Sequence, residues 1–486
     1  MIVKIKSMKY LYTLIAIVFY MSANAQIAWT SGINISTNTF SNERPQIALD
    51  RAGNPMVIWG RMSDESVFFS KWNGTLFSPP IKLNPSWLTV ATADWMGPAI
   101  AAHGDTVYVV VKRTPETSDT NRLFVISSFN GGNSFNAPVE LAFIGDSISR
   151  LPTITTDDMG NPIVAYMKFN ASSLDSRWVV TRSNDYGLTF TSDVKVSGWG
   201  NSTEVCDCCP GSVASSGNEA IMMYRDNNLN TRDIWASHSS DNANTFPSGF
   251  SVDINGWFVV SCPSSGPDGE IIGDTLYTTF MSRGSGSFRT YLNKSSISSG
   301  SLSTVSTLTG PITGLILQNF PKMAKDGNAM AIVWRQVASG QASLPLLYTN
   351  DVSNGFPVAY DTVDIDNITN TDVAIKNGNI YVVWQDDNSG TVKFRSGNYT
   401  PGTTGIEEPS AANFSIYPNP SEEFITINSK NNHPFQVNIF NSIGEKVYSS
   451  NQQQKLRLPI ESWMNGLYLI QINTGNNLFD YKFVKQ

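Results

Sequence analysis

A segment of about fifty residues recurs along the chain and constrains its fold more than any other sequence feature. Residues 45–59 form a phrase that returns from Pro98 and from Pro152, each time as two apolar stretches around a turn of Gly, Asp or Asn. Weaker copies start at Pro210, Pro263, Pro321 and Asp372. Successive copies begin 51 to 58 residues apart. Apolar and polar residues that alternate are typical of strands. The chain is therefore predicted to repeat one β-rich unit.

Each copy is long enough for four strands, and the second strand usually ends on an aromatic residue. These aromatics are Trp59, Tyr166, Tyr224, Phe280, Trp334 and Trp384. Four antiparallel strands in a repeat of ~50 residues are the unit of a β-propeller. The seventh copy ends near Tyr399, one strand short, and residues 27–36 could supply the missing strand. We therefore predict an all-β fold with a seven-bladed propeller over residues 26–399, and six blades as the alternative.

The N-terminus predicts export. Three lysines precede an apolar run at residues 11–21, which ends at Ala23-Asn24-Ala25. This order is typical of a secretory signal peptide over residues 1–25, and the run is too short to span a bilayer core of ~30 Å. No later segment has the length of a transmembrane helix. We expect a secreted or cell-surface protein without a transmembrane segment.

Composition excludes one class of partner. The net charge is −7, and no basic stripe is present that could displace counterions from nucleic-acid phosphates. Nucleic acid is therefore not expected as a ligand.

After residue 399 the sequence changes character. Residues 400–412 read as a linker, and short alternating strands over residues 413–486 predict a small β-sandwich. The stretch Phe414-Ser-Ile-Tyr-Pro-Asn-Pro420, the tripeptide Gly466-Leu-Tyr468 and the end Lys482-Phe-Val-Lys485 resemble a type A sorting domain of the Bacteroidota type IX secretion system. The resemblance implies that the secretion machinery is a partner. It also implies removal of this domain, followed by release or attachment to surface lipopolysaccharide.

Three turns share the pattern Ser-x-Asp-x-Gly-x-Thr-Phe. It is complete around Asp185 and Gly187, has Asn130 in place of Asp in a second turn, and lacks the Gly after Asp241. The pattern resembles that of the sialidase-like Asp-box (BNR repeat) superfamily. In such turns the Asp accepts hydrogen bonds from its own turn and the aromatic fills the blade. We expect these residues to stabilise the fold and to lie opposite the ligand.

Basic residues follow the ends of the second strands, at the end of the propeller that carries the blade-to-blade connectors. They are Arg61, Arg113, Lys168, Arg225, Arg283 and Arg335. Guanidinium groups suit planar carboxylates. The connector aromatics Trp95 and Trp257 could stack on sugar rings. Together with these aromatics and Asp226, the basic residues predict a site for an acidic glycan. Solvated strand ends that merely carry charge are the alternative.

A sialidase-like glycoside hydrolase is a second possible function. Its candidate residues are Asp94 as the acid, Glu204 as the activating carboxylate and Tyr224 as the nucleophile. The opening Arg-Ile-Pro motif of that family is not intact, because Arg44 directly precedes Pro45. Tyr224 also aligns with the core aromatics, which favours packing.

All the cysteines lie in two connectors that enter adjacent repeats: Cys206, Cys208, Cys209 and Cys262. An even number in an exported protein predicts two disulfides, and three pairings are possible. Joining Cys209 to Cys262 would link neighbouring blades. It would also leave Cys206 to close a strained ring with Cys208. A site for Cu or Zn on these thiolates, with Asp207 and Asp226 as further ligands, therefore stays open.

The cysteine motif also carries a narrower resemblance. Cys206-Asp-Cys208-Cys209-Pro210, with Gly256-Trp257 and Cys262-Pro263 downstream, is similar to a CxCC-containing group of Asp-box propellers. The resemblance implies no particular activity.

Overall fold

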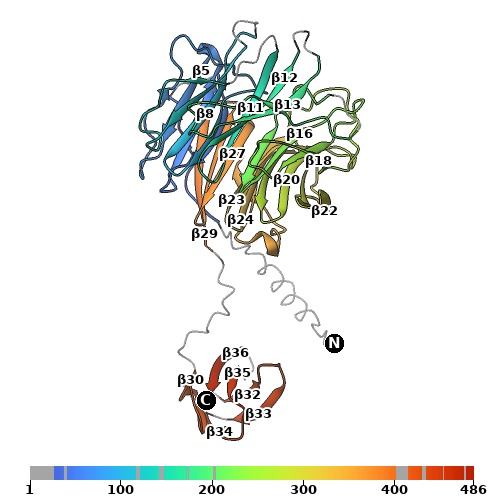
Figure 1. Cartoon of the computed structure of the whole chain (residues 1–486). Helices are drawn as coiled ribbons and strands as arrows, with labels where there is room; N and C mark the ends of the chain where they lie inside the picture. The colour runs from blue at the N-terminus through green and yellow to red at the C-terminus, as the bar shows by residue number, and fades with distance from the viewer. Residues whose placement is uncertain are drawn as a thin grey trace, which may run out of the picture. The chain divides into compact units, whose positions relative to one another are not determined.

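The computed structural model describes two compact units, Met1–Thr400 and Pro401–Gln486 (Figure 1). The described residues are 27–37, 41–116, 121–141, 147–170, 172, 174–200, 204–400, 414–429, 434–452, 454–474 and 478–486. The predicted signal peptide and nearly all of the predicted linker lie outside them.

Six sheets of the first unit each consist of four consecutive strands, and every strand pairs with the next one in the chain. The first three sheets contain β3 (Asn42–Leu49), β4 (Pro55–Arg61), β5 (Ser66–Lys71) and β6 (Ile81–Lys82); β7 (Ala99–His103), β8 (Thr106–Lys112), β9 (Leu123–Ser128) and β10 (Val139–Glu140); and β11 (Ile148–Thr156), β12 (Pro162–Phe169), β13 (Arg177–Arg182) and β14 (Val194–Lys195). The next three contain β15 (Ser212–Ser216), β16 (Glu219–Arg225), β17 (Ile234–Ser239) and β18 (Ser248–Ser251); β19 (Asp268–Ile272), β20 (Thr275–Ser282), β21 (Arg289–Ser296) and β22 (Ser301–Thr307); and β23 (Leu315–Asp326), β24 (Ala329–Ala338), β25 (Gln341–Thr349) and β26 (Asp361–Asp364).

The remaining sheet of this unit joins the two ends of the unit. It contains β27 (Ile368–Lys376), β28 (Asn379–Asp386) and β29 (Thr391–Tyr399), and both β1 (Ile27–Trp29) and β2 (Ile33–Asn34) pair with β29. The pairing is antiparallel and places Ile27 opposite Tyr399. Residues 27–36 thus supply the outer strand that the sequence of the last repeat lacks.

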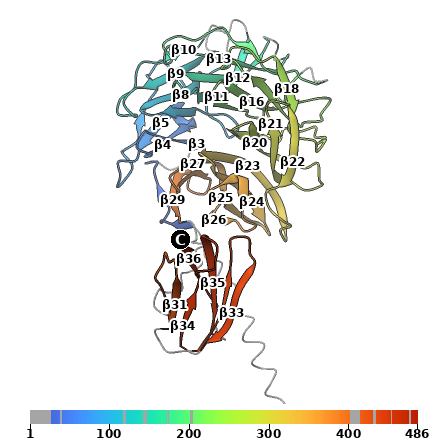
Figure 2. The same cartoon turned by 60° about the horizontal axis from the view of Figure 1, so that its bottom comes forward.

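The innermost strands form a closed circle. Each of β3, β7, β11, β15, β19 and β23 contacts the innermost strand of the next sheet, and β27 contacts β3 again. Figure 2 shows the sheets arranged around a centre. All these strands line a central space with a cavity volume of about 360 Å³. The described part of the first unit is therefore all-β and propeller-like, apart from two single-turn 3-10 helices, η1 (Met62–Asp64) and η2 (Val352–Asn354).

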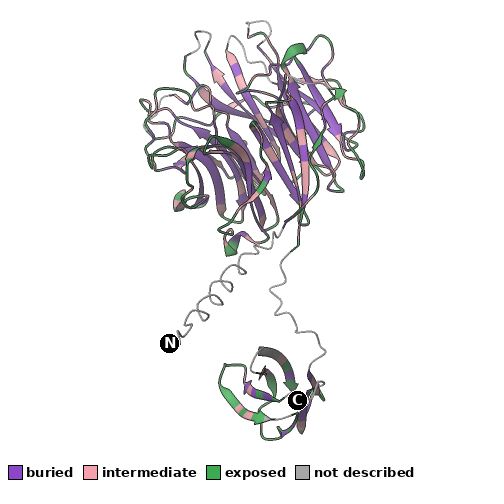
Figure 3. Cartoon of the chain, turned by 180° about the vertical axis from the view of Figure 1, so that it is seen from behind, coloured by how far each residue is buried: buried purple, intermediate pink, exposed green. Residues whose placement is uncertain are grey.

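The second strand of each sheet carries the core between neighbouring sheets. Strands buried on both faces are apolar along most of their length rather than alternating, and residues 55–60 of β4 are all buried. Figure 3 shows that buried residues predominate along the strands of this unit. The six aromatics expected to end second strands are each at most 1% exposed. Their burial explains why these positions repeat in sequence.

The second unit contains two sheets around one core. The first has β30 (Phe414–Tyr417), β31 (Phe424–Ser429) and β34 (Lys455–Pro459). The second has β33 (Lys446–Gln452), β32 (Phe435–Phe440), β35 (Gly466–Asn473) and β36 (Leu478–Lys485). Buried residues of both sheets share one apolar cluster. Among the described residues of the whole chain, no helix has the length and apolarity needed to cross a membrane.

Strand β1 offers a test of ring closure. Ile27 is 4% exposed and packs in the cluster between the last two sheets, whereas Ala28 on the same strand is exposed. Replacing Ile27 by Ala removes three buried carbons and should lower the free energy of unfolding by ~2–4 kcal/mol. The control Ala28→Ser should change it by less than ~0.5 kcal/mol. Denaturant unfolding followed by tryptophan fluorescence measures both, and equal effects would show that β1 does not hold the ring.

Candidate functional site

The strand order gives the propeller-like unit two different ends. Turns from first to second and from third to fourth strands lie at one end. The connectors between sheets and the ends of the second strands lie at the other, which we call the connector face. Arg61, Arg225 and Arg335 stand at or near the ends of β4, β16 and β24, and Arg113 and Arg283 directly follow β8 and β20.

The three turns that resemble Asp boxes share one hydrogen-bond pattern at the end opposite the connector face. Asp185 Oδ1 accepts from Ser183 Oγ at 2.7 Å and from the Thr189 backbone N–H at 2.9 Å. Asn130 and Asp241 accept from the equivalent atoms of their own turns. Gly187 has φ of +81°, a conformation that glycine adopts without strain. These contacts are internal to each turn, as expected for a stabilising role.

Two of the basic side chains on the connector face are held by neighbouring carboxylates. Arg61 donates Nε and Nη2 to the two oxygens of Asp64 at 2.8 and 2.6 Å. Lys168 Nζ lies 2.9 Å from Asp193 Oδ2. Asp64 already accepts from the two guanidinium N–H groups of Arg61 that would otherwise bind a ligand carboxylate.

Arg225 is a structural residue, in contrast to the ligand-binding role predicted from its position. Its side chain is 0% exposed. The guanidinium donates to the backbone carbonyls of Arg232 at 2.7 Å, Ser265 at 3.1 Å and Met281 at 2.7 Å. It lies 5.1 Å from the ring centroid of Trp257, which is itself 5% exposed. Because both side chains are enclosed, neither Arg225 nor Trp257 presents a surface to a glycan.

The other candidate residues have separate surroundings. Arg283 is exposed, with its guanidinium 4.8 Å from the ring centroid of Phe288. Nε of Arg113 and of Arg335 is buried and without a hydrogen-bond partner in the described structure, and burial lowers the pKa of Arg335. Asp226 is 4% exposed, and its backbone N–H donates to the Asp233 carbonyl at 2.9 Å. Arg225, Arg283 and Arg335 therefore do not share one carboxylate site.

The three candidate catalytic residues have different surroundings. Tyr224 is 0% exposed and packs within the core, and burial raises the pKa of its hydroxyl. The prediction that Tyr224 is a nucleophile is therefore wrong, because the side chain is enclosed by other core residues. Glu204 accepts the backbone N–H of Asp175 at 3.2 Å. Asp94 is exposed on the connector between β6 and β7.

The connector that carries Asp94 and Trp95 lies across the mouth of the central space. The Asp94 carbonyl accepts from Arg44 Nη1 of β3 at 2.9 Å and from Asn370 Nδ2 of β27 at 3.2 Å. On the other side, the Leu151 N–H of β11 donates to the Met96 sulfur at 3.5 Å, and the Arg150 guanidinium lies 5.8 Å from the Trp95 ring. This connector therefore contacts the innermost strands of the last, first and third sheets.

A repeated backbone irregularity shapes the same mouth. The register shifts between Glu43 and Gln46, and again between Asn319 and Lys322. The residues before the repeat prolines, Arg44 and Phe320, have φ of 51° and 50°. Bulges of this kind redirect side chains. Arg44 and Phe320 line a small pocket at the mouth, with a cavity volume of about 40 Å³, together with Pro45, Lys322 and Asn370.

A carboxylate beside Arg44 was not singled out from the sequence. Glu43 is 7% exposed, and its Oε2 has no hydrogen-bond partner in the described structure. Burial raises the pKa of Glu43 to about 7, and the charges of Asp94 and Asp387 act in the same direction, whereas Arg44 opposes them. Its position in the altered Glu43-Arg44-Pro45 motif was the only signal in the sequence.

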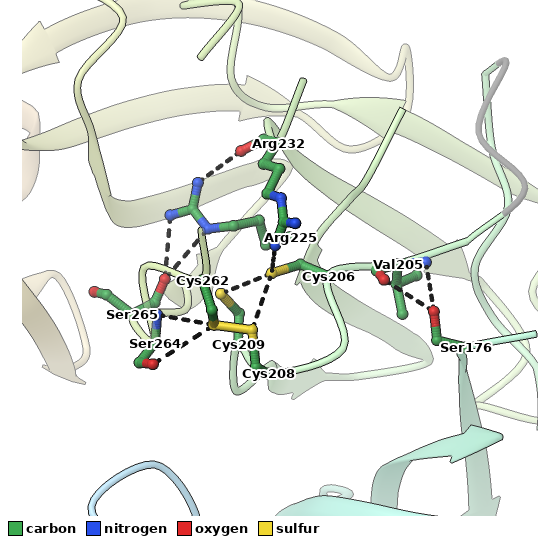
Figure 4. Close-up of a disulfide and its surroundings, with 10 residues drawn as sticks. All are labelled: Ser176, Val205, Cys206, Cys208, Cys209, Arg225, Arg232, Cys262, Ser264 and Ser265. Atoms are coloured by element: carbon green, nitrogen blue, oxygen red, sulfur yellow. Dashed lines mark hydrogen bonds between the residues drawn. A yellow bond between two sulfur atoms is a disulfide. The ribbon is translucent and has the colours of Figure 1, made fainter. Parts of the chain in front are cut away.

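The four cysteines meet at the seam between the fourth and fifth sheets (Figure 4). Cys208 and Cys262 form a disulfide, whereas Cys206 and Cys209 are free and buried. Cys206 Sγ lies 3.1 Å from Cys209 Sγ and accepts from Arg232 Nη1 at 3.1 Å. The pairing differs from the Cys209–Cys262 link considered from the sequence.

The electrostatics of the buried pair are unequal. The hydrogen bond between Cys206 and Cys209 lowers the pKa of Cys206 to about 6, against the effect of burial, and the positive charges of Arg225 and Arg232 lower it further. Burial raises the pKa of Cys209 well above its ordinary value. All four sulfurs lie within 4.8 Å of one another, so a fully reduced cluster is compact enough for a thiolate metal site. The disulfide removes two of those ligands.

Glu43 supplies a pH-dependent test of this site. Its folded pKa of about 7 lies above the ordinary value of 4.5, so folding favours the protonated form. The stabilisation is complete below the unfolded pKa and is lost as the pH rises through 7. At pH 8, Glu43→Gln should therefore have a free energy of unfolding ~3 kcal/mol higher than that of the wild type, and at pH 5 the difference should fall below ~1 kcal/mol. Denaturant unfolding at both pH values measures this, with the exposed carboxylate variant Glu140→Gln as the control. A pH-independent effect of Glu43→Gln would contradict the assignment.

Comparisons with known proteins identify the tail and support the fold of the larger unit. Residues 415–486 match the family model of the secretion system C-terminal sorting domain. No curated protein sequence matches the chain significantly.

Several solved structures are similar to this chain at low sequence identity. A polysaccharide lyase of family PL25, an ulvan lyase bound to -[GlcA(1-4)Rha3S]-, is 11% identical with a TM-score of 0.50, over 75% of this chain and 95% of its own. Polysaccharide lyase Uly1 is 12% identical with a TM-score of 0.48, over 76% and 92%. The α-L-arabinofuranosidase Arb93A from Fusarium graminearum is 14% identical with a TM-score of 0.43, over 67% and 98%. The chain thus joins a β-propeller-like unit to a type IX secretion sorting domain, which implies export to the cell surface or the medium.

Proposed function

We propose that this protein is an exported seven-bladed β-propeller that binds an acidic glycan at the mouth of its central channel. The seven sheets are its blades over residues 26–399, and residues 413–486 are a β-sandwich recognised by the type IX secretion machinery. The three Asp-box turns favour membership of the sialidase-like Asp-box superfamily. Sorting-domain export places such a protein where it meets extracellular polysaccharides.

The observation that carries the proposal is the position of Arg44. It lines the mouth pocket with Lys322, beneath the connector that carries Asp94 and Trp95. Its side-chain hydrogen bonds to Asp94 and Asn370 both leave from Nη1. Nε and Nη2 therefore remain as donors for a planar carboxylate. Arg44 thus replaces the dispersed arginines as the proposed anion contact.

The protonation of Glu43 supports anion binding in the same place. With a pKa of about 7, Glu43 is largely neutral in mildly acidic solution, so Arg44 then faces one negative charge fewer. A glycan carboxylate is expected to bind more tightly below pH 7 than above it. The ulvan lyase, whose fold is similar, is bound to a glycan that contains glucuronic acid, so this fold is compatible with such a ligand.

A glycoside hydrolase is the second candidate, because one observation favours it. A buried carboxyl with a raised pKa and an unpartnered oxygen, near other carboxylates, is suited to donate a proton. In that case Glu43 would be the acid, in place of Tyr224-based chemistry. Loss of turnover with retained binding in Glu43→Gln would distinguish hydrolysis from binding alone.

Arg44→Lys tests the binding proposal while keeping the positive charge. The probe is a glucuronic-acid oligosaccharide, and its carboxyl-reduced form is the neutral control. Loss of the guanidinium fork should weaken binding of the acidic probe at pH 6 about tenfold, equal to ~1.4 kcal/mol. Isothermal calorimetry measures the affinity, and Arg283→Lys on the same face should leave it unchanged.

Two results would overturn the proposal. Equal binding of the acidic and the carboxyl-reduced probe would remove the acidic specificity. Binding of neither probe by the folded wild-type protein would remove the glycan function itself.

A further inference from the structure

The four cysteines are divided into a buried dithiol and a partly exposed disulfide. Cys206 and Cys209 are 0% and 1% exposed, whereas Cys208 and Cys262 both reach the surface. The two pairs belong to one compact cluster of sulfurs (Figure 4). We propose that this cluster is a thiol–disulfide exchange site, which passes the reducing equivalents of the buried pair through the surface pair to an external disulfide. This activity is independent of the proposed glycan site.

The contacts of Cys206 suit the attacking thiolate. Its sulfur lies 3.8 Å from the Cys208 sulfur of the disulfide. Arg232 Nη1 donates to it at 3.1 Å, and a cationic donor stabilises a thiolate. Attack by a thiolate on a disulfide sulfur is the ordinary route of exchange. In the first step the Cys206–Cys208 bond forms, the Cys208–Cys262 bond breaks, and Cys262 leaves as the thiolate.

Cys209 is placed to complete the transfer. Its sulfur lies 3.1 Å from that of Cys206, and the two residues have the C-x-x-C spacing of dithiol pairs. In the second step the Cys206–Cys209 bond forms and the Cys206–Cys208 bond breaks. Cys208 leaves with the electron pair and takes the proton released by Cys209. The two steps move one disulfide from the surface to the interior and require no outside oxidant or reductant.

The surface pair then meets the substrate. The Cys262 thiolate attacks an external disulfide R–S–S–R′, forming a mixed disulfide and releasing one thiol. Cys208 attacks the mixed disulfide, which restores Cys208–Cys262 and releases the second thiol. The external disulfide is thus reduced by two electrons, and the chain ends with both pairs oxidised. Because Cys206 and Cys209 are enclosed, the surface pair is the only part of the cluster that a bulky substrate reaches directly.

A matched pair of proteins tests the transfer. Limited reduction with a dithiol brings the purified wild type to the state with two free thiols, and the variant Cys208→Ser/Cys262→Ser has the same two buried thiols without the surface pair. The probe is the aromatic disulfide 5,5′-dithiobis(2-nitrobenzoic acid). The folded wild type should release two equivalents of aryl thiolate per chain, at least about tenfold faster than the variant. Equal rates in the two proteins would overturn the proposal, since the reagent would then reach the buried thiols directly.

Cys209→Ser traps the intermediate and keeps the test valid if the double variant is unstable. Without the resolving thiol, reaction should stop after one equivalent, with the probe attached to Cys262 and Cys206 joined to Cys208. Peptide mapping by mass spectrometry locates both bonds. Probe found on Cys206 would contradict the proposed route. Protection of all four thiols by one equivalent of Zn²⁺ in the fully reduced wild type would instead assign the cluster to metal binding and overturn the exchange site.

Discussion

Closure of the circle of innermost strands is the constraint on which the rest of the structure depends. Each sheet buries both faces against its neighbours, so no sheet is stable alone, and the pairing of β1 with β29 supplies the last outer strand. Contacts across the closure reach the mouth pocket directly. The Arg44 N–H donates to Gln385 Oε1 at 3.1 Å, and the Ile47 N–H donates to Asp372 Oδ2 at 3.0 Å. The mouth pocket combines the first and last sheets, and it exists only in the closed ring.

At the seam between the fourth and fifth sheets, a buried arginine and a close approach of two connectors hold the sheets together. Arg225 ties the end of β16 to the connector at Ser265 and to β20 through backbone carbonyls. A side chain at Gly266 would meet the Pro210 carbonyl oxygen at 1.8 Å, so only glycine allows the two connectors to approach this closely. This approach brings the cysteines of both connectors together. Without it, the surface disulfide and the buried thiols would belong to separate places in the fold.

The sequence was a good guide to the strands and a poor one to side-chain partners. Alternation of apolar residues and the repeated aromatics located the second strands, because burial between sheets is a property of single positions. The role of Arg225 depended on carbonyls 7, 40 and 56 residues away, which no local pattern reveals. Glu43 and Arg44 were hidden for another reason. A register shift and the left-handed backbone of Arg44 determine where they point, and alternation alone would misplace them.

The direction of the carboxyl pKa shifts separates stabilising acids from those available for function. In the turns opposite the connector face, hydrogen bonds within the turn lower the pKa of Asp185, and similar bonds outweigh burial at Asp241. On the connector face, burial raises the pKa of Glu43 and Asp387, although Arg61 lowers that of its partner Asp64. A lowered pKa stabilises the fold at neutral pH, whereas a raised pKa destabilises it there. Acids whose raised pKa destabilises the folded state are found most often where the acid serves binding or catalysis. Burial also raises the pKa of Asp253, Glu270 and Asp372, so the shift alone does not single out Glu43. Its place beside Arg44, which lines the mouth pocket, distinguishes it from these acids.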